Sequence, residues 1–447
     1  MSFIPNTDND RKQMLDAIGV GSFEELINNL PGEIRLKGEL NLPNKMSEFE
    51  VSKMLSEYAA RNVSSSTHTC FMGGGAYDHF IPAVVGFVLE RPEFKTAYTP
   101  YQAEVSQGTL QVMYEFQSMI CALTGMDASN ASMYDCGTSI AEACLMAHAH
   151  NKRSEIVFAG TVNPHYRNVV SSVTQGKNLT FKSAVAEDGT CDLSALAAMV
   201  SDATSAVVVQ HPNGYGTLED VRAIEKIAHE HKCLFIVITD MISLGLLEAP
   251  GEYGADVVVA EGQTLGIPLS FGGPYLGIFA VKKALVRKMP GRICGITQDT
   301  TGERGFVLTL QTREQHIKRE NATSNICSNQ GLMMLAATVY MATMGKQGIR
   351  ETAELCLQKA HYLAENIKKI PGFKIVASGK PFFREFLVET PVPASEIVKA
   401  AEKEGILAGV DTSRFPECKA GLLVAVTEKR TKEEMDKYIE LLKRFGK

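Results

Sequence analysis

The sequence predicts an α/β fold with a mainly parallel sheet, followed by a smaller C-terminal α+β domain. Between residues 61 and 330, short runs rich in Val, Ile and Phe alternate with helical runs, which is typical of a parallel sheet covered by helices. These apolar runs have no period of two, so we expect both faces of each strand to be buried. Near Asn329 the pattern changes to two long helical stretches followed by short strands.

We assign residues 61–330 to one large α/β domain, because the expected strands and helices alternate throughout it. Asp192 and Thr217 are suitable N-caps for its last two helices. Strands are expected at residues 132–134, 156–159, 206–210, 233–239, 256–260 and 275–281, and helices at residues 139–150, 193–200 and 218–231.

The regions before and after this domain have different patterns. Residues 1–60 are expected to form a helical arm, in which Ser22 and Ser47 cap two of three short helices. Such an arm buries little by itself, so we expect it to lie on another domain or subunit. Residues 331–447 are expected to form the small domain. The helices are expected at residues 8–18, 22–30, 47–61, 329–344, 348–369, 394–404 and 432–445, and the strands at 373–377, 383–389 and 421–426.

Composition excludes several classes of protein. The 447 residues are 45% hydrophobic and 21% charged, with a net charge of −6, so a globular fold without a basic nucleic-acid face is expected. The first ten residues do not resemble a secretory signal, and the apolar runs are too short to cross a bilayer. Ten cysteines without a Cys-x-x-Cys pair indicate reduced thiols, and we expect a cytoplasmic protein. The His pairs are spaced two apart, so no metal site is expected.

Two segments have the strand-then-turn pattern at which open parallel sheets bind ligands. In the first, Gly137, Thr138 and Ser139 either hold a phosphate through backbone N–H groups or cap a helix. In the second, Asp240 follows an apolar strand, and its carboxylate either binds a ligand or closes a turn.

A third segment, residues 261–277, separates two expected strands and is rich in glycine. A structural turn explains one or two of its glycines, whereas the whole run implies that the backbone closely approaches something. His211 and His165 end other strands of the large domain. Each is either a buried, hydrogen-bonded histidine or part of a pocket.

Two further segments are polar. One is a glycine loop without the strand-then-helix context of a nucleotide-binding loop. The other is a charged run at residues 313–325, which is either a solvated helix face or a segment that reaches another surface. The residues singled out in these segments are Gly73, Gly74, Gly75, Thr323, Ser324 and Asn325.

Four long blocks of the chain resemble one known family. They are FIPNT at residues 3–7, GAYDHFIPAVV at 75–85, YTPYQAEVSQG at 98–108 and LQTREQHIKRENATSNIC at 310–327. On these blocks, and with similarity that runs essentially from end to end, the chain resembles the glycine cleavage system P-protein family. Within that family it is similar to the α subunit, or subunit 1, of glycine dehydrogenase (decarboxylating).

The resemblance implies the fold of type I pyridoxal-phosphate enzymes. It also implies a reaction, in which the cofactor forms an imine with glycine, accepts the electrons left when CO2 departs, and allows the aminomethyl group to pass to the lipoyl arm of the H-protein. The family's T- and L-proteins are then expected partners in the same system. In the cofactor-bearing relatives, a lysine that precedes Thr and Ile-Pro holds the cofactor.

In this chain the lysine position is Gln263, in the sequence QTLGIP, and a carboxamide cannot form an imine. Lys282 and Lys283 follow the next strand and lie on the wrong side of the loop. The resemblance therefore implies no catalytic lysine here, a degenerate phosphate loop at Gly137, Thr138 and Ser139, and an Asp240 near the position of the aspartate that pairs with the cofactor ring.

Because two subunits build each active site in type I enzymes, we expect a cofactor-bearing β subunit and an α2β2 assembly. Gly73–Gly75 and the Thr323–Asn325 segment are the parts expected to reach the partner's site. Two alternatives stay open at this stage. One is an autonomous pyridoxal-phosphate enzyme that uses another lysine, and the other is a non-catalytic regulatory subunit.

Overall fold

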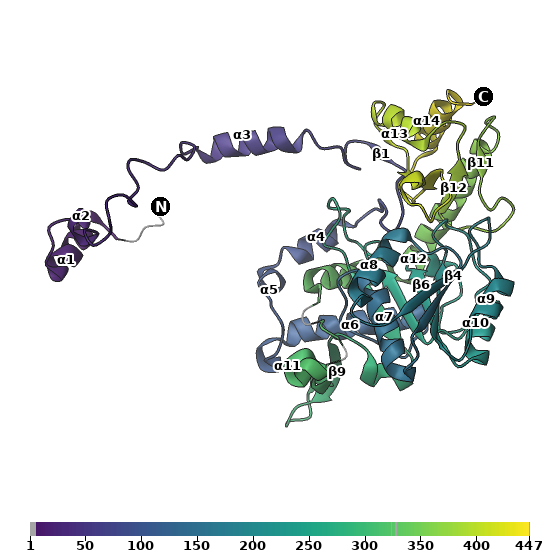
Figure 1. Ribbon diagram of the computed structural model, residues 1–447, viewed down its shortest axis with the longest axis horizontal. Coiled ribbons are helices and arrows are strands. Elements are labelled where there is room, and N and C mark those ends of the chain that lie inside the picture. Colours follow the sequence, from purple (N-terminus) through teal and green to yellow (C-terminus); the bar gives the residue numbers. More distant parts are fainter. Residues whose placement is uncertain (1–5, 323, 327–328, 447) are drawn as a thin grey trace. The chain divides into compact units, whose positions relative to one another are not determined.

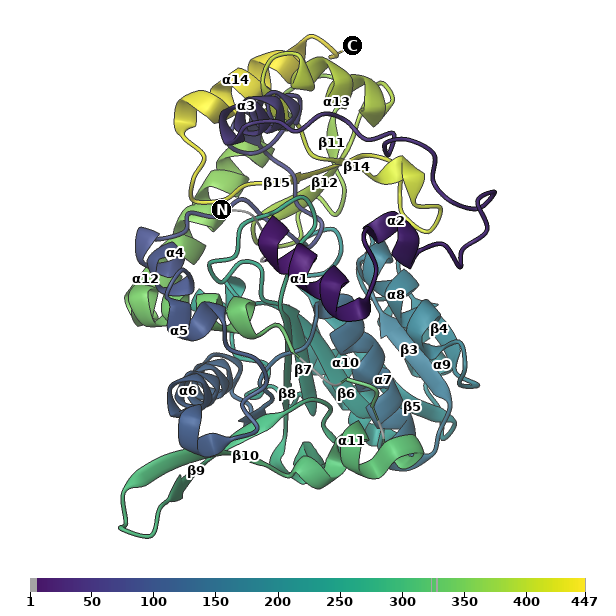
Figure 2. The ribbon, with the colours of Figure 1, turned by 90° about the vertical axis from the view of Figure 1, so that its left-hand side faces the viewer.

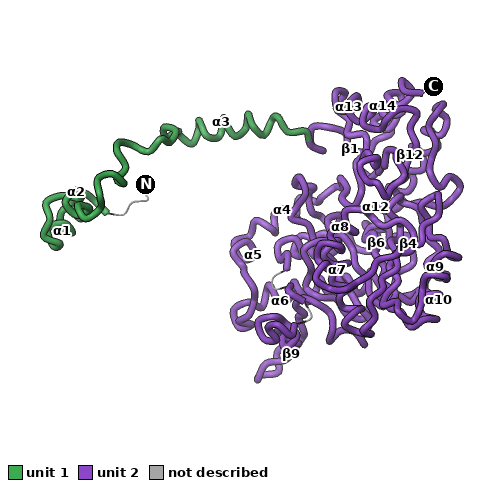
Figure 3. Tube along the Cα trace, in the orientation of Figure 1, with its two compact units in different colours: residues 1–63 green, residues 64–447 purple. Residues whose placement is uncertain are grey.

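The chain divides into two compact units, Met1–Val63 and Ser64–Lys447 (Figure 3). The computed structural model describes residues 6–322, 324–326 and 329–446. The predicted Thr323, Cys327 and residues 3–5 therefore lie outside the described residues. Among the described residues, no helix is long and apolar enough to cross a membrane.

The N-terminal unit contains the three predicted helices, α1 (Asp8–Ile18), α2 (Phe23–Leu26) and α3 (Glu48–Ala59). Ser22 caps α2, and Ser47 forms a capping box with Glu50 at α3, as predicted. None of the three helices has a buried residue. Local capping therefore defines these helices, and their apolar side chains remain unburied within the unit.

A seven-stranded sheet forms the centre of the second unit, and five of its strands run parallel, which confirms the predicted architecture (Figure 1). The remaining two strands are antiparallel to their neighbours. The strand order is β2 (Ala128–Ser129), β8 (Gly277–Val281), β7 (Val257–Glu261), β6 (Leu234–Asp240), β5 (Thr204–His211), β3 (Glu155–Ala159) and β4 (Thr180–Ala184).

Alternate residues of the central strands enter two different cores, because helices cover both faces of the sheet. In β6, Phe235 and Val237 pack on one side, and Ile236 and Ile238 pack on the other. The first core includes α6 (Gln107–Thr124), α9 (Leu193–Met199), α10 (Val221–Glu230) and α12 (Gly331–Ile367), and the second includes α7 (Cys136–Asn151) and α8 (Pro164–Thr174). Burial on both faces explains why these strands lack a period of two.

A four-stranded antiparallel sheet lies in the C-terminal part, with its own core (Figure 2). Its order is β11 (Lys374–Ile375), β12 (Glu385–Glu389), β15 (Leu422–Ala425) and β14 (Val410–Asp411), and α13 (Ala394–Glu402) and α14 (Lys432–Lys443) pack beside it. The remaining elements are α4 (Ala83–Leu89), α5 (Pro92–Lys95), α11 (Gln315–Lys318), the parallel pair β1 (Thr69–Cys70) and β13 (Ile406–Leu407), and the hairpin β9 (Ile293–Gln298) and β10 (Arg304–Thr309).

Several local predictions were wrong. Residues 132–134 contribute a single bridge, Met133 to Gly277, rather than a strand. Helix α7 begins at Cys136, three residues earlier than predicted, because Asp135 caps it. Asp220, not Thr217, caps α10. Helix α6 was not predicted. The two predicted helices near residue 345 are joined, with a non-helical Gly345 between them.

Gly216 brings the two sheets into close contact. Its φ is +83°, and a Cβ there would meet the backbone carbonyl of Glu385, at the start of β12. The adjacent bridge Thr217 to Phe382 forms at the same place. The small sheet can therefore approach the carboxyl edge of the large one only because residue 216 has no side chain.

We expect Gly216→Ala to lower the free energy of unfolding by about 2 kcal/mol, because alanine is strained at this φ and its Cβ would displace β12. Urea unfolding of the full chain followed by circular dichroism measures the change. The matched control is Gly86→Ala, at an exposed position of helix α4 where an added Cβ would meet nothing within 4 Å. It should stabilise by about 0.5–1 kcal/mol. Equal effects of the two substitutions would contradict the close-approach argument.

Candidate functional site

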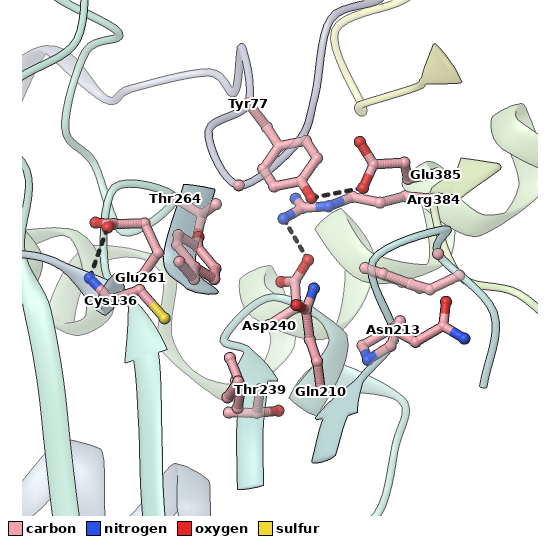
Figure 4. A pocket seen from close by; sticks show the side chains of 16 residues that line it. Tyr77, Cys136, Gln210, Asn213, Thr239, Asp240, Glu261, Thr264, Arg384 and Glu385 are labelled. Carbon is pink, nitrogen blue, oxygen red and sulfur yellow. Dashed lines mark hydrogen bonds and ion pairs between the residues drawn. The ribbon is translucent and has the colours of Figure 1, made fainter. Parts of the chain in front are cut away.

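A small cavity lies where the carboxyl ends of β5, β6 and β7 meet the start of β12 (Figure 4). Its volume is about 40 Å³, which leaves room for about three water molecules. The buried Thr264 Oγ1 lines it and has no hydrogen-bond partner among the described residues. The other lining residues are Gly75, Tyr77, Cys136, Tyr166, Gln210, Pro212, Asn213, Gly216, Ile238, Thr239, Asp240, Glu261, Phe383, Arg384 and Glu385.

The guanidinium of Arg384 fills the centre of this region. Arg384 is 1% exposed and forms an ion pair with Asp240, at the end of β6. The ring of Tyr77 lies over the guanidinium, with 3.7 Å between the Arg384 Cζ and the ring centroid. Burial, the largest single effect, lowers the pKa of Arg384, but Asp240 and the other acidic groups around it together outweigh burial and raise that pKa. The cation is therefore held between a carboxylate and an aromatic face.

The ion pair continues to a second carboxylate through His79. Arg384 donates to His79 Nε2, so His79 Nδ1 carries the proton and donates to Glu428 at 2.6 Å. Burial opposes ionisation of Glu428, yet the hydrogen bonds from His79 and the Phe80 N–H lower its pKa to about 2. The contacts thus run from the Asp240 carboxylate through the Arg384 guanidinium and the His79 ring to the Glu428 carboxylate.

The same cluster contains the one grouping among the described residues that could hold a metal ion, His79, Cys356 and Glu428. The Cys356 thiol lies 3.6 Å from Glu428, but His79 uses both ring nitrogens, one toward Arg384. A fixed cation beside the histidine disfavours a second cation at this place. The hydrogen bonds among these side chains explain why they lie together, and a metal ion is not required.

Glu385 closes the cavity toward the predicted glycine loop. Its carboxylate accepts the Gly74 N–H at 2.6 Å and the Tyr77 hydroxyl at 2.9 Å. Burial raises the pKa of Glu385 to about 7. A Cβ at Gly73 would collide with this carboxylate, so the loop needs glycine there. Gly73, Gly74 and Gly75 therefore cover the chain's own cavity.

At the N-terminus of α7, the backbone donors face a carboxylate of the same chain. Glu261, at the end of β7, accepts the N–H groups of Cys136, Gln263 and Leu276, each at 3.1 Å. Burial raises the pKa of Glu261 to about 8. The predicted hydroxyls of Thr138 and Ser139 bond to Asp135 instead, and Gly137 packs on Val169. These three residues form the first turn of the helix.

The Gln263 carboxamide is buried and fully used. Its oxygen accepts the Tyr77 N–H at 2.8 Å, and its nitrogen donates to the carbonyls of Tyr77 at 3.1 Å and Ile267 at 2.7 Å. An amide supplies both the acceptor and the donors that this loop requires, whereas a lysine supplies donors alone. Lys282 bonds Asp256, which precedes β7, so it lies at the opposite edge of the sheet.

The remaining predicted residues lie in separate places. Ser324 and Asn325 line a different hollow together with Glu142 of α7, whose pKa burial raises to about 7. His211 is buried and accepts the Glu219 N–H, as one interpretation predicted. His165 is exposed and packs on Phe415, so the buried interpretation was wrong for it.

The sequence did not indicate the roles of six residues of this site, which are Tyr77, His79, Glu261, Arg384, Glu385 and Glu428. One signal was available: Arg384 and Glu385 are adjacent charges inside the apolar run 382–388. A buried charge needs a partner, so this pair indicated a polar network. The partners themselves are hundreds of residues away in the chain, and no spacing rule connects them.

The comparisons with known proteins agree over the whole chain. The family description "Glycine cleavage system P-protein" matches residues 1–442. A relative from Chloroherpeton thalassium, "Probable glycine dehydrogenase (decarboxylating) subunit 1", is 54% identical over 443 residues, covering 99% of each chain. A crystal structure of glycine decarboxylase (P-protein) in inhibitor-bound form aligns with a TM-score of 0.89 and 39% identity, covering 100% of both chains.

More distant structures share only the fold. Sphingosine-1-phosphate lyase from Burkholderia pseudomallei aligns with a TM-score of 0.67 at 15% identity, covering 92% of this chain and 93% of the lyase chain. The predicted fold class, a type I α/β fold with a mainly parallel sheet, is thereby confirmed.

The pKa of Glu385 gives a pH test. Its ordinary pKa is 4.5 and its folded pKa about 7, so the wild type loses stability as pH rises from 4.5 to 7. Glu385→Gln stays neutral. We expect its stability relative to wild type to rise by about 3 kcal/mol across this window. Urea unfolding at several pH values measures this.

Glu428→Gln provides a contrasting control. The folded pKa of Glu428 is about 2, so its stabilising contribution is present above pH 4.5 and is lost as pH falls toward 2. The stability of Glu428→Gln relative to wild type should therefore rise as pH falls. Parallel pH profiles of wild type and Glu385→Gln between pH 4.5 and 7 would refute the assignment.

Proposed function

The chain belongs to the glycine cleavage system P-protein family, and from this premise we propose that it is the subunit of glycine dehydrogenase (decarboxylating) that does not carry the cofactor. Together with a second subunit it decarboxylates glycine and passes the aminomethyl group to the lipoyl arm of the H-protein. The full-length match to subunit 1 relatives supports the enzyme assignment. The single observation that carries the division of labour is Gln263 in the position of the lysine.

The residues present do not fit pyridoxal phosphate. The cavity of about 40 Å³ is far smaller than the roughly 300 Å³ or more of ordinary cofactor pockets. Among the described residues, no lysine lines it. Asp240 is already paired with Arg384, and at the start of α7 the Cys136 N–H is bonded to Glu261 and the Thr138 N–H to Asp135. We therefore assign the cofactor, together with the chemistry that it carries, to the partner β subunit.

Exposed apolar residues in both units support association with other subunits, and we propose that the assembly is α2β2. In the N-terminal unit, Ile34, Leu42 and Phe49 are each at least 70% exposed. In the second unit, Tyr98 and Phe271 are 82% and 78% exposed. Apolar exposure of this extent is typical of interfaces.

A hollow of about 300 Å³ in the second unit is the proposed place of contact with the partner. It is lined by Phe94, Tyr98, Pro100, Met113, Pro274 and Met333, among other residues. Ser324 and Asn325 are proposed to reach toward the partner's active site, whereas the predicted Gly73–Gly75 loop covers this chain's own cavity. In this scheme the enzyme is an oxidoreductase of the cytoplasm that works with the H-, T- and L-proteins.

The two alternatives from the sequence have less support. An autonomous enzyme needs a lysine near Asp240, and Lys282 lies at the opposite edge of the sheet. A regulatory subunit without a catalytic partner does not explain the end-to-end similarity to subunit 1 of an enzyme. Borohydride reduction with pyridoxal phosphate, followed by peptide mapping, separates the first alternative, because it requires a labelled lysine in this chain.

Mixing purified subunits tests the proposal. This chain alone should not exchange the glycine carboxyl with bicarbonate, and neither should the β subunit alone. Exchange should appear when both are combined with lipoylated H-protein, because the active site then has all its parts. Exchange by this chain alone, or full exchange by the β subunit alone, would overturn the proposal.

The contact surface has its own test. We expect Tyr98→Asp to weaken association with the β subunit by about tenfold or more, because a charge replaces an aromatic side chain that the proposed interface would bury. Analytical ultracentrifugation of the mixed subunits measures this. Val185→Asp, at an exposed valine that lines neither this hollow nor the one at Ser324 and Asn325, is the matched control and should associate normally. Normal association of Tyr98→Asp would remove this surface from the interface.

A further inference from the structure

We infer that the ancestral cofactor pocket of this chain is occupied by an internal plug, formed by Arg384, Tyr77 and Glu261. The plug, and not only the loss of the lysine, excludes pyridoxal phosphate. The inference concerns the isolated chain, so it stands or falls independently of the proposed two-subunit enzyme. Side chains of both halves line the cavity (Figure 4), and we assign one half to the place of the cofactor's ring and the other to the place of its phosphate.

The ring half is the pair Arg384 and Tyr77. Asp240 is the carboxylate expected to pair with a protonated ring nitrogen, and here its partner is the planar, positively charged guanidinium of Arg384. Tyr77 covers the face of that plane at 3.7 Å, as an aromatic side chain would cover a ring. A flat cation bound to the carboxylate and stacked on one face thus has the same interactions that a pyridinium would make.

The phosphate half is Glu261. A helix N-terminus attracts anions because its first N–H groups have no partner in the helix. At α7 the carboxylate of Glu261 accepts the first of these, from Cys136, and also the N–H groups of Gln263 and Leu276. Asp135 takes the Thr138 N–H at 2.8 Å. Two side chains of the same protein therefore satisfy donors that would otherwise bind a phosphate.

The plug is part of the core rather than a mobile side-chain arrangement. Arg384 is bound to Asp240 on one side and to His79 on the other, and His79 is bound to Glu428. The neighbouring Glu385 holds the Gly74 N–H and the Tyr77 hydroxyl. Withdrawal of Arg384 would leave the Asp240 carboxylate without its counter-charge and His79 Nε2 without its donor, so the closed pocket is the stable state.

Restoring the lysine separates the two explanations. Each full-length variant is incubated with pyridoxal phosphate, reduced with borohydride and mapped for a pyridoxyl label at position 263. Gln263→Lys alone should remain unlabelled at that position. The triple variant Gln263→Lys, Glu261→Ala, Arg384→Ala should be labelled there. Equal labelling of the single and triple variants, or a folded triple variant without label, would overturn the inference.

Single substitutions test each half if the triple variant does not fold. Inorganic phosphate should raise the melting temperature of Glu261→Ala, because three N–H donors are exposed to an anion. It should not do so for wild type or for Glu261→Gln, whose carboxamide still fills the space. Millimolar guanidinium, but not urea, should restore part of the melting temperature lost in Arg384→Ala. Absence of both ligand effects would refute the plug.

Discussion

The buried charge of Arg384 constrains the architecture around it. A guanidinium with 1% exposure must find its compensating charge inside the protein. Asp240 supplies that charge from the end of β6, and Tyr77 and His79 complete the surroundings from the loop after β1. Three segments from distant parts of the sequence therefore meet at one side chain. Removing Asp240 would leave the buried Arg384 cation without its counter-charge.

The two sheets are held in contact by this requirement. Glu385 begins β12 of the small sheet and Arg384 directly precedes it, whereas Asp240 and Glu261 belong to the large sheet. The contact is possible because Gly216 and Gly73 have no side chains where the segments approach each other. The ionic network holds the two sheets together, and the two glycines leave room for this joint between them.

In the proposed function, this joint also explains how a cofactor fold can persist without a cofactor. In a parallel sheet the carboxyl edge collects strand ends and a helix N-terminus, which creates a place for a charged ligand. Here the anion-binding and cation-binding features of that edge are both satisfied by side chains of the same chain. The fold is thus complete in itself, and its exposed apolar surfaces, such as those at Tyr98 and Phe271, are available for a partner.

The sequence by itself determined the fold class, most central strands, the caps of the arm helices and the carboxamide at Gln263, because each depends on local composition, periodicity or a long matching block. It also pointed to Asp240. Only the tertiary structure decided what Asp240 binds, that Glu261 covers the α7 N-terminus, and that Gly73–Gly75 cover the chain's own cavity. These contacts join residues up to about three hundred positions apart, as from Tyr77 to Glu385. Pairing at that range is set by packing of the sheets, which no local pattern encodes.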